Sequence, residues 1–217
     1  MLFLAIYFAS VVLFCGAWYW LSRRHIRRRA ACVLRWIEAA LDGQGRVIGM
    51  RWIGAARFKV PLRLASSVFH RAWMLVDLCP CEMPTQWLWS KLTHREDQVT
   101  FQADLDWAPP FSLDVHNFRW FARSSRKSST PPGGWTLEQI GPFIITTRMQ
   151  WQKEITSAMT SLVETRNREF LHISFSRTSP HFSVSMPLEA ISPACPTRSG
   201  VFDAVREVAA SSLPSLY

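Results

Sequence analysis

An uncharged run at the start of the chain limits what this sequence can fold into more than any other feature. Residues 1–21 contain no acidic or basic side chain and are almost all apolar. About 20 apolar residues, each rising ~1.5 Å along a helix, span ~30 Å, the thickness of the hydrocarbon core of a bilayer. Trp18, Tyr19 and Trp20 end the run, and such amphipathic rings favour the headgroup level. The run predicts a transmembrane helix over 1–21.

A cleaved signal peptide is the alternative interpretation of this run. Signal peptides carry their positive charge before the apolar stretch and need small residues at the cleavage site. Here no basic residue precedes the stretch, and bulky aromatic residues occupy the place where cleavage would fall. We therefore expect the segment to remain attached as an anchor.

Five arginines follow the apolar run at once and set its expected orientation. They are Arg23, Arg24, Arg27, Arg28 and Arg29. Positive flanks stay on the cytoplasmic side, so we expect a single-pass protein of the cell inner membrane with its N-terminus outside and its body in the cytoplasm. Near anionic lipid each arginine contributes about 1 kcal/mol, so these side chains are also candidate membrane-surface ligands, with the lipid bilayer as a partner.

The charge and cysteine content narrow the remaining possibilities. The five arginines supply more than half of the net charge of +9, so the rest of the chain has no excess that would indicate nucleic-acid binding. The chain has five cysteines, an odd number, and in a reducing cytoplasm we expect all of them to be free thiols. Hydrophobic residues make up 48% of the chain, which is ample for a folded core.

Residues 22–42 are expected to form a basic juxtamembrane segment and an amphipathic helix. Val33, Trp36, Ile37, Ala40 and Leu41 recur at helical spacing and would form one apolar stripe. Two glycines at 43 and 45 then end the helical pattern.

Residues 43–122 are predicted to be rich in strands. Apolar side chains alternate with polar ones over 57–64, where Pro61 indicates an edge or a bulge, and 68–79 fits a more buried strand. Residues 86–92 fit either a short helix or a strand. Over 99–121 the apolar positions are odd-numbered on both sides of Pro109 and Pro110, which predicts an antiparallel hairpin with one buried face.

The last third of the chain reads as a second half of the body. Residues 123–134 hold no large apolar side chain and are expected to be a basic flexible loop or linker. Residues 135–217 are predicted as a β-α-β-β half: a strand at 143–145, a helix starting with a capping box at Thr147 and Gln150, two strands, and a C-terminal helix. The expected class is α+β, with one N-terminal transmembrane helix followed by antiparallel hairpins and packed helices.

One cluster of polar residues invites a chemical hypothesis. Asp104, Asp106, Asp114 and His116 would share the polar face of the 99–121 hairpin. Cross-strand partners on one face come within ~5.5 Å, and carboxylates with an imidazole suit a divalent metal. Alternation alone also predicts polar residues on a solvated face, and we favour that interpretation. No cofactor and no catalytic residue is therefore assigned, and no zinc-protease, nucleophile-elbow or phosphate-loop motif occurs in the sequence.

Three functions remain after this reading. The first is a membrane-anchored interaction or scaffolding protein that faces the cytoplasm, has no catalytic activity and recruits an unidentified protein partner. The second is a lipid-binding domain that takes acyl chains from the adjacent leaflet, which requires a cavity of at least ~300 Å³. The third is a membrane-bound, metal-dependent hydrolase that uses Asp104, Asp106, Asp114 and His116. An exposed apolar patch or an unpaired strand edge would favour the first.

Overall fold

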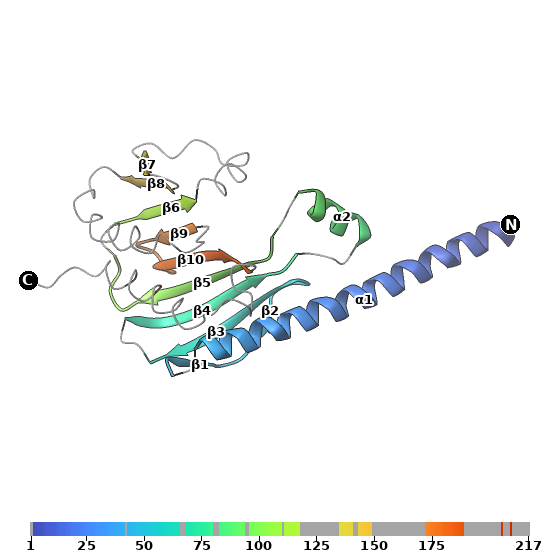
Figure 1. The fold of residues 1–217 in the computed structure, drawn as a ribbon, viewed down its shortest axis with the longest axis horizontal. Coiled ribbons are helices and arrows are strands. Elements are labelled where there is room, and N and C mark those ends of the chain that lie inside the picture. The colour runs from blue at the N-terminus through green and yellow to red at the C-terminus, as the bar shows by residue number, and fades with distance from the viewer. Residues whose placement is uncertain are drawn as a thin grey trace, which may run out of the picture.

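The computed structural model describes residues 2–41, 43–65, 68–79, 83–93, 96–109, 111–117, 135–140, 143–148 and 172–188, together with Val205 and Ala209. These residues form a long N-terminal helix followed by an antiparallel β-sheet, so the chain is an α+β protein (Figure 1). The helices are α1 (Leu2–Ala40) and α2 (Pro84–Leu92). The strands are β1 (Gly45–Val47), β2 (Arg51–Trp52), β3 (Arg57–Leu64), β4 (Phe69–Asp77), β5 (Gln98–Leu105), β6 (Leu113–Asn117), β7 (Trp135–Ile140), β8 (Phe143–Arg148), β9 (His172–Phe175) and β10 (Phe182–Pro187).

The anchor run and the amphipathic stripe belong to one uninterrupted helix. α1 has 39 residues and is therefore about 58 Å long at ~1.5 Å per residue. Its first half projects beyond the sheet, and its second half runs beside the sheet (Figure 1). Most of the predicted stripe is buried in the same hydrophobic core as the strands, namely Val33, Ile37, Ala40 and Leu41. The burial also extends back to Ile26 and Ala30, which the prediction did not include. The segments that the sequence suggested separately are thus continuous.

A glycine turn ends α1 and returns the chain to the sheet. Gly43 has φ of +79°, a backbone conformation that favours glycine just after a helix C-terminus. The amides of Gln44 and Gly45 both donate to the carbonyl of Leu41, which satisfies an acceptor that the helix leaves open. β1 then starts at Gly45, so this turn sets where the edge of the sheet lies relative to α1.

The strands join into one sheet in an order that sequence alternation did not reveal. The order is β1-β3-β4-β5-β10-β9-β6-β8-β7, with β2 also pairing to β3. The hairpins β3–β4, β9–β10 and β7–β8 are adjacent in both sequence and space. The β9–β10 hairpin lies between β5 and β6, so strands from 43–122 and from 135–217 complete the same sheet.

The predicted 99–121 hairpin is wrong, although its buried face is right. β5 pairs with β4 and β10, whereas β6 pairs with β8 and β9. The odd-numbered side chains of β5 are buried, as are Leu113 and Val115. Alternation fixes which side chains face the core but not which strand lies alongside, because β9 and β10 carry the same two-residue period.

The helix predicted to start at Thr147 is wrong at its first residues. Thr147 lies within β8 opposite Leu113 and Thr136, so it does not begin a helix. The rest of that predicted helix lies outside the described residues, as does most of the C-terminal one, where Val205 and Ala209 are helical and buried.

The position of Pro61 in β3 agrees with the prediction of an edge or a bulge. Pro61 faces the break between β1 and β2, where its missing N–H costs no ladder hydrogen bond.

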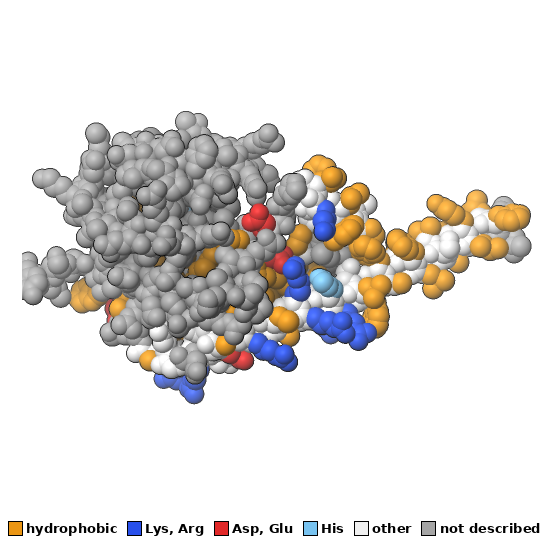
Figure 2. Space-filling model, in the orientation of Figure 1, with side chains coloured by type: hydrophobic (Ala, Val, Ile, Leu, Met, Phe, Trp, Pro, Cys, Tyr) orange, Lys and Arg blue, Asp and Glu red, His pale blue; other side chains and the backbone are white. Residues whose placement is uncertain are grey.

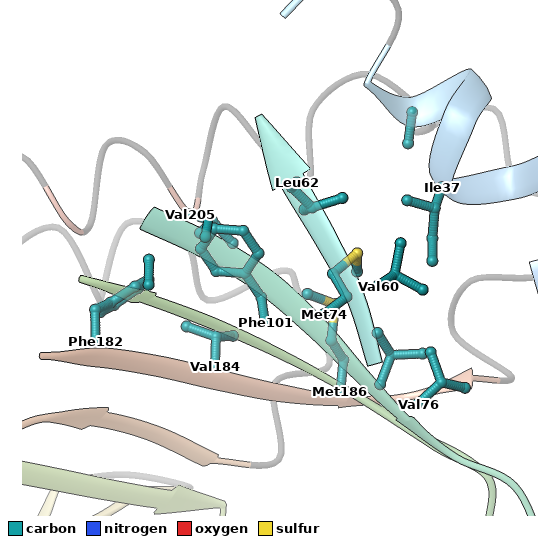
Figure 3. Close-up of a cluster of buried hydrophobic side chains, with 14 of the residues drawn as sticks. Ile37, Val60, Leu62, Met74, Val76, Phe101, Phe182, Val184, Met186 and Val205 are labelled. Atoms are coloured by element: carbon teal, nitrogen blue, oxygen red, sulfur yellow. The ribbon is translucent and has the colours of Figure 1, made fainter. Parts of the chain in front are cut away.

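The core lies between α1 and one face of the sheet. Ile37 of α1 faces Val60 and Leu62 of β3 (Figure 3). Farther along this face, Phe69, Phe101, Phe182 and Phe175 form a chain of ring contacts, with centroids 4.9–6.3 Å apart. Each fully buried side chain of this size stabilises the fold by about 1.5–3 kcal/mol. These rings therefore contact one another along the described part of the inner face.

Candidate membrane interface

The structure does not bring together the four residues of the predicted polar face, Asp104, Asp106, Asp114 and His116. Asp104 is in β5 and Asp114 is in β6, and β10 and β9 lie between these strands. Three strand spacings of ~4.8 Å put the two backbones ~14 Å apart. Asp106 is exposed beyond the end of β5, and the backbone of His116 lies opposite His172. Among the described residues, no group of three or more His, Cys, Asp or Glu side chains could hold a metal ion.

Each of the two strand aspartates has a different neighbour. Asp104 lies opposite Arg71, and its Oδ1 accepts a hydrogen bond of 2.7 Å from the hydroxyl of Ser179. Asp114 Oδ1 is 3.4 Å from Nε2 of His172 in the adjacent strand. The two carboxylates thus lie in two separate places on the sheet, each beside a different neighbour.

A basic and aromatic surface surrounds α1 where the helix leaves its apolar half. Arg23, Arg24, Arg27 and Arg28 are exposed, whereas Ser22, Ile26 and Ala30 on the other side of the helix are buried. The arginines therefore point away from the sheet because the helical period puts the two sets on different faces. We call these four side chains the arginine face. Figure 2 shows blue side chains along this part of the helix, next to the orange apolar half.

Aromatic rings hold part of the arginine face in place. The guanidinium of Arg23 lies 5.0 Å from the ring centroid of Tyr19, and that of Arg24 lies 5.4 Å from the centroid of Trp20. Both pairs are four residues apart, the spacing at which side chains meet on a helix. Arg27 and Arg28 lie beside these pairs on the same helix. The four guanidinium groups thus form an exposed surface suited to anionic headgroups and not an enclosed binding site.

The fifth arginine has a different environment. Arg29 Nη1 lies 2.5 Å from Oδ2 of Asp97, whose side chain is only 6% exposed. Asp97 Oδ1 also accepts the backbone N–H of Cys79 at 2.6 Å, and the Asp97 carbonyl accepts the N–H of Leu188 at 2.8 Å. Asp97 thus ties α1 to the chain after β4 and after β10. Sequence reasoning missed this residue, since a single acid before a strand carries no distinctive signal.

The second helix carries an exposed apolar surface near the same point. Met83, Trp87, Leu88, Trp89 and Leu92 are all exposed on or beside α2. The Trp87 ring meets the Trp18 ring of α1 edge-on, with centroids 5.8 Å apart. Figure 2 shows orange side chains over α2 on the side of the body from which the apolar half of α1 projects. The sequence left this segment undecided between helix and strand.

Length and composition identify α1 as a candidate membrane span. Over its most apolar 18-residue window the mean hydropathy is 1.8, and none of that window is buried in the protein. It is the one helix among the described residues that meets these criteria. The chain matches no family model, and no curated protein is similar to it in sequence. Its function is therefore inferred from geometry.

Proposed function

We propose that this chain is a single-pass inner-membrane protein whose body faces the cytoplasm and acts as a non-catalytic interaction or scaffolding module. One observation carries the proposal: α1 is a continuous helix whose apolar half has no buried side chain among those described and whose other half belongs to the core of the body. Contact with lipid carries no hydrophobic free-energy penalty for these apolar side chains, whereas exposure to water carries a large one. The continuous helix holds the body at a fixed height above the bilayer.

The arginine face supports the proposed orientation. Arg23, Arg24, Arg27 and Arg28 lie within seven residues of the end of the apolar run, and all four are exposed. Positive residues this close to a span favour the cytoplasmic side. Their position opposite the sheet leaves them available to anionic headgroups while the body stays folded.

A strand edge supports the proposed role in binding a protein. Among the strands that the structure describes, none pairs with the outer side of β1 or β2. Ile48, Trp52 and Ile53 are exposed along this edge. An open edge with apolar and aromatic side chains suits the addition of a strand from a partner. We call these three residues the edge patch.

The lipid-binding function and the hydrolase function have less support. An acyl-chain carrier needs an apolar cavity, and the described inner face is occupied by contacting phenylalanine rings. A metal-dependent hydrolase needs converging ligands, and the strands that carry Asp104 and Asp114 are separated by two others.

The orientation is tested with a reporter enzyme that is active only outside the cytoplasm. Fused after Tyr217, it should be inactive, and the same reporter fused before Met1 should be active. Activity at the C-terminal position would contradict the cytoplasmic placement of the body.

Partner binding is tested by photo-crosslinking in intact membranes. A photoreactive amino acid at Ile48 or Ile53 should give a discrete cross-linked product. The same amino acid at Thr178, an exposed position in the β9–β10 turn, serves as the control and should give none. If neither edge-patch position cross-links to a protein while the chain is membrane-inserted, the scaffolding proposal is wrong.

A further inference from the structure

α2 exposes more apolar surface than a nine-residue helix in water should carry. Trp89 is 69% exposed and Leu92 is 67% exposed, and Leu88 and Met83 are also exposed. Clustered exposed apolar side chains mark a surface that meets a protein or a membrane.

The apolar side chains of α2 are arranged on the side away from the body. Ser90 is buried, and its hydroxyl donates to the carbonyl of Trp87. Leu88 and Leu92 are four residues apart and share one face, and Trp89 extends that face. At 100° per residue this face lies opposite Ser90. The helix therefore has a side that meets the protein and an apolar side that faces outward.

The contact with α1 places α2 at a defined level along the candidate span. Trp87 contacts Trp18, which lies near the end of the apolar run, five residues before Arg23. Lys91 Nζ lies 5.7 Å from the centroid of the Trp87 ring, so a cation accompanies the aromatic pair. Tryptophan with a neighbouring cation is typical of the membrane–water interface.

We propose that α2 is an interfacial helix that inserts Leu88, Trp89 and Leu92 into the leaflet from which α1 emerges, with lipid as its occupant. This inference rests on the proposed membrane insertion of α1. Continuity argues for lipid, because the apolar surface of α2 adjoins that of α1 through Trp18 and Trp87 (Figure 2), and lipid covers the latter. Amphipathic helices of this kind lie ~5–10 Å deep at the headgroup boundary.

A second contact with the bilayer has a consequence for the whole body. A single span leaves the body able to rotate about the axis of α1. An inserted α2 fixes that rotation, so the sheet and its edge patch point in one direction relative to the membrane plane. The chain then presents its partner surface at a set angle as well as a set height.

Depth-dependent fluorescence quenching tests this inference in the full-length chain. The dye is attached either to Cys15, within the apolar half of α1, or to Trp89→Cys in α2; all other cysteines are replaced by serine. The protein is placed in phosphatidylcholine–phosphatidylglycerol vesicles that contain nitroxide lipids labelled at the headgroup or deep in the acyl chain. We expect shallow nitroxides to quench the dye at 89 and deep ones to quench the dye at 15. A dye at Thr178→Cys should be quenched by neither.

The two positions separate the failure of this inference from the failure of the anchor. Quenching at 15 without quenching at 89 would overturn the interfacial role of α2, and would leave its apolar face to a protein, while the anchor stands. Absence of quenching at both positions would overturn the membrane insertion itself.

A charge placed on the apolar face supplies an independent check. Leu92→Glu should remove the shallow quenching at 89, because a carboxylate resists transfer into the headgroup–acyl boundary. Gln86→Glu adds the same charge at an exposed position outside the apolar face and should leave the quenching in place. Equal quenching in the two variants would contradict the inference, and thermal unfolding of each variant in detergent shows that both remain folded.

Discussion

Single residues at the joins between elements hold this fold together. Asp97 is the clearest case, because one buried carboxylate meets a helix arginine and a backbone amide from a different strand connection. Gly45 is another, because a Cβ at this position would overlap the backbone of β3. Both residues act where segments distant in sequence meet.

Replacing Asp97 with alanine should lower the free energy of unfolding by about 2–3 kcal/mol, because the Cys79 amide and the Arg29 guanidinium both lose a charged acceptor. Arg29 is 52% exposed and can turn to water, which keeps the loss below that of a fully buried pair. Chemical denaturation in detergent measures it. The control is Arg57→Ala, which breaks the exposed pair with Asp77 and should cost under about 1 kcal/mol. Equal losses would show that Asp97 has no special role.

Gly45→Ala should also destabilise the protein, by about 1–3 kcal/mol, the usual range for forced overpacking. A Cβ at this position would lie 2.5 Å from the carbonyl oxygen of Arg63, and that atom belongs to the backbone of β3. Gly49→Ala is the matched control, since a Cβ there meets nothing within 4 Å. Thermal melting of the two variants should separate them clearly. A neutral Gly45→Ala would mean that β1 shifts freely on β3.

At the scale of elements, α1 combines a candidate membrane span with a core helix. Its buried side chains lie on one face and the arginine face lies on another, so the two functions do not compete for the same positions. The junction between the exposed and buried halves lies near Ser22, where the first buried side chain occurs.

Ile37→Ala tests how strongly α1 is docked on the sheet. Ile37 is completely buried against β3, so its truncation should cost about 2–4 kcal/mol through lost burial and a residual cavity. Arg35→Ala, on the exposed side of the same helix, should change the unfolding free energy by less than about 0.5 kcal/mol. A small effect of Ile37→Ala would indicate that α1 is only loosely attached to the body.

Mutation of the five arginines should have two separable effects, one on orientation in the membrane and one on the stability of the fold. Changing Arg23, Arg24, Arg27 and Arg28 to glutamine should leave the melting temperature in detergent unchanged and should mix the orientations of the inserted chain, because the topological signal is lost. Adding Arg29→Gln should in addition lower the melting temperature, because the Asp97 ion pair is removed. Reporter fusions measure orientation, and an unchanged orientation would show that other determinants set it.

At the scale of the whole molecule, one sheet joins distant parts of the chain. The β9–β10 hairpin has to lie between β5 and β6 before the sheet is continuous. Native pairing of β5 and β6 with their neighbours therefore depends on residues synthesised much later, which is typical of folds with many long-range contacts.

Removing residues 1–21 should leave a folded body. None of the apolar window in this segment is buried, so its loss removes little of the core apart from the contact between Trp18 and Trp87. We expect a cooperative thermal transition close to that of the full chain. Alkaline extraction should release the shortened chain from membranes and retain the full one. Loss of cooperative unfolding would show that the apolar run contributes to the core after all.

The sequence by itself determined the local features of this protein. The uncharged run, the stripe at Val33 and Ile37, and the buried faces of β3 and β5 all follow from short-range periodicity, which depends on backbone geometry alone. The tertiary structure decided which strands pair, why Arg29 differs from its four neighbours, and where α2 meets α1. These features join residues far apart in the chain. Several strands share the same alternation, so the choice among them depends on the packing of the complete sheet.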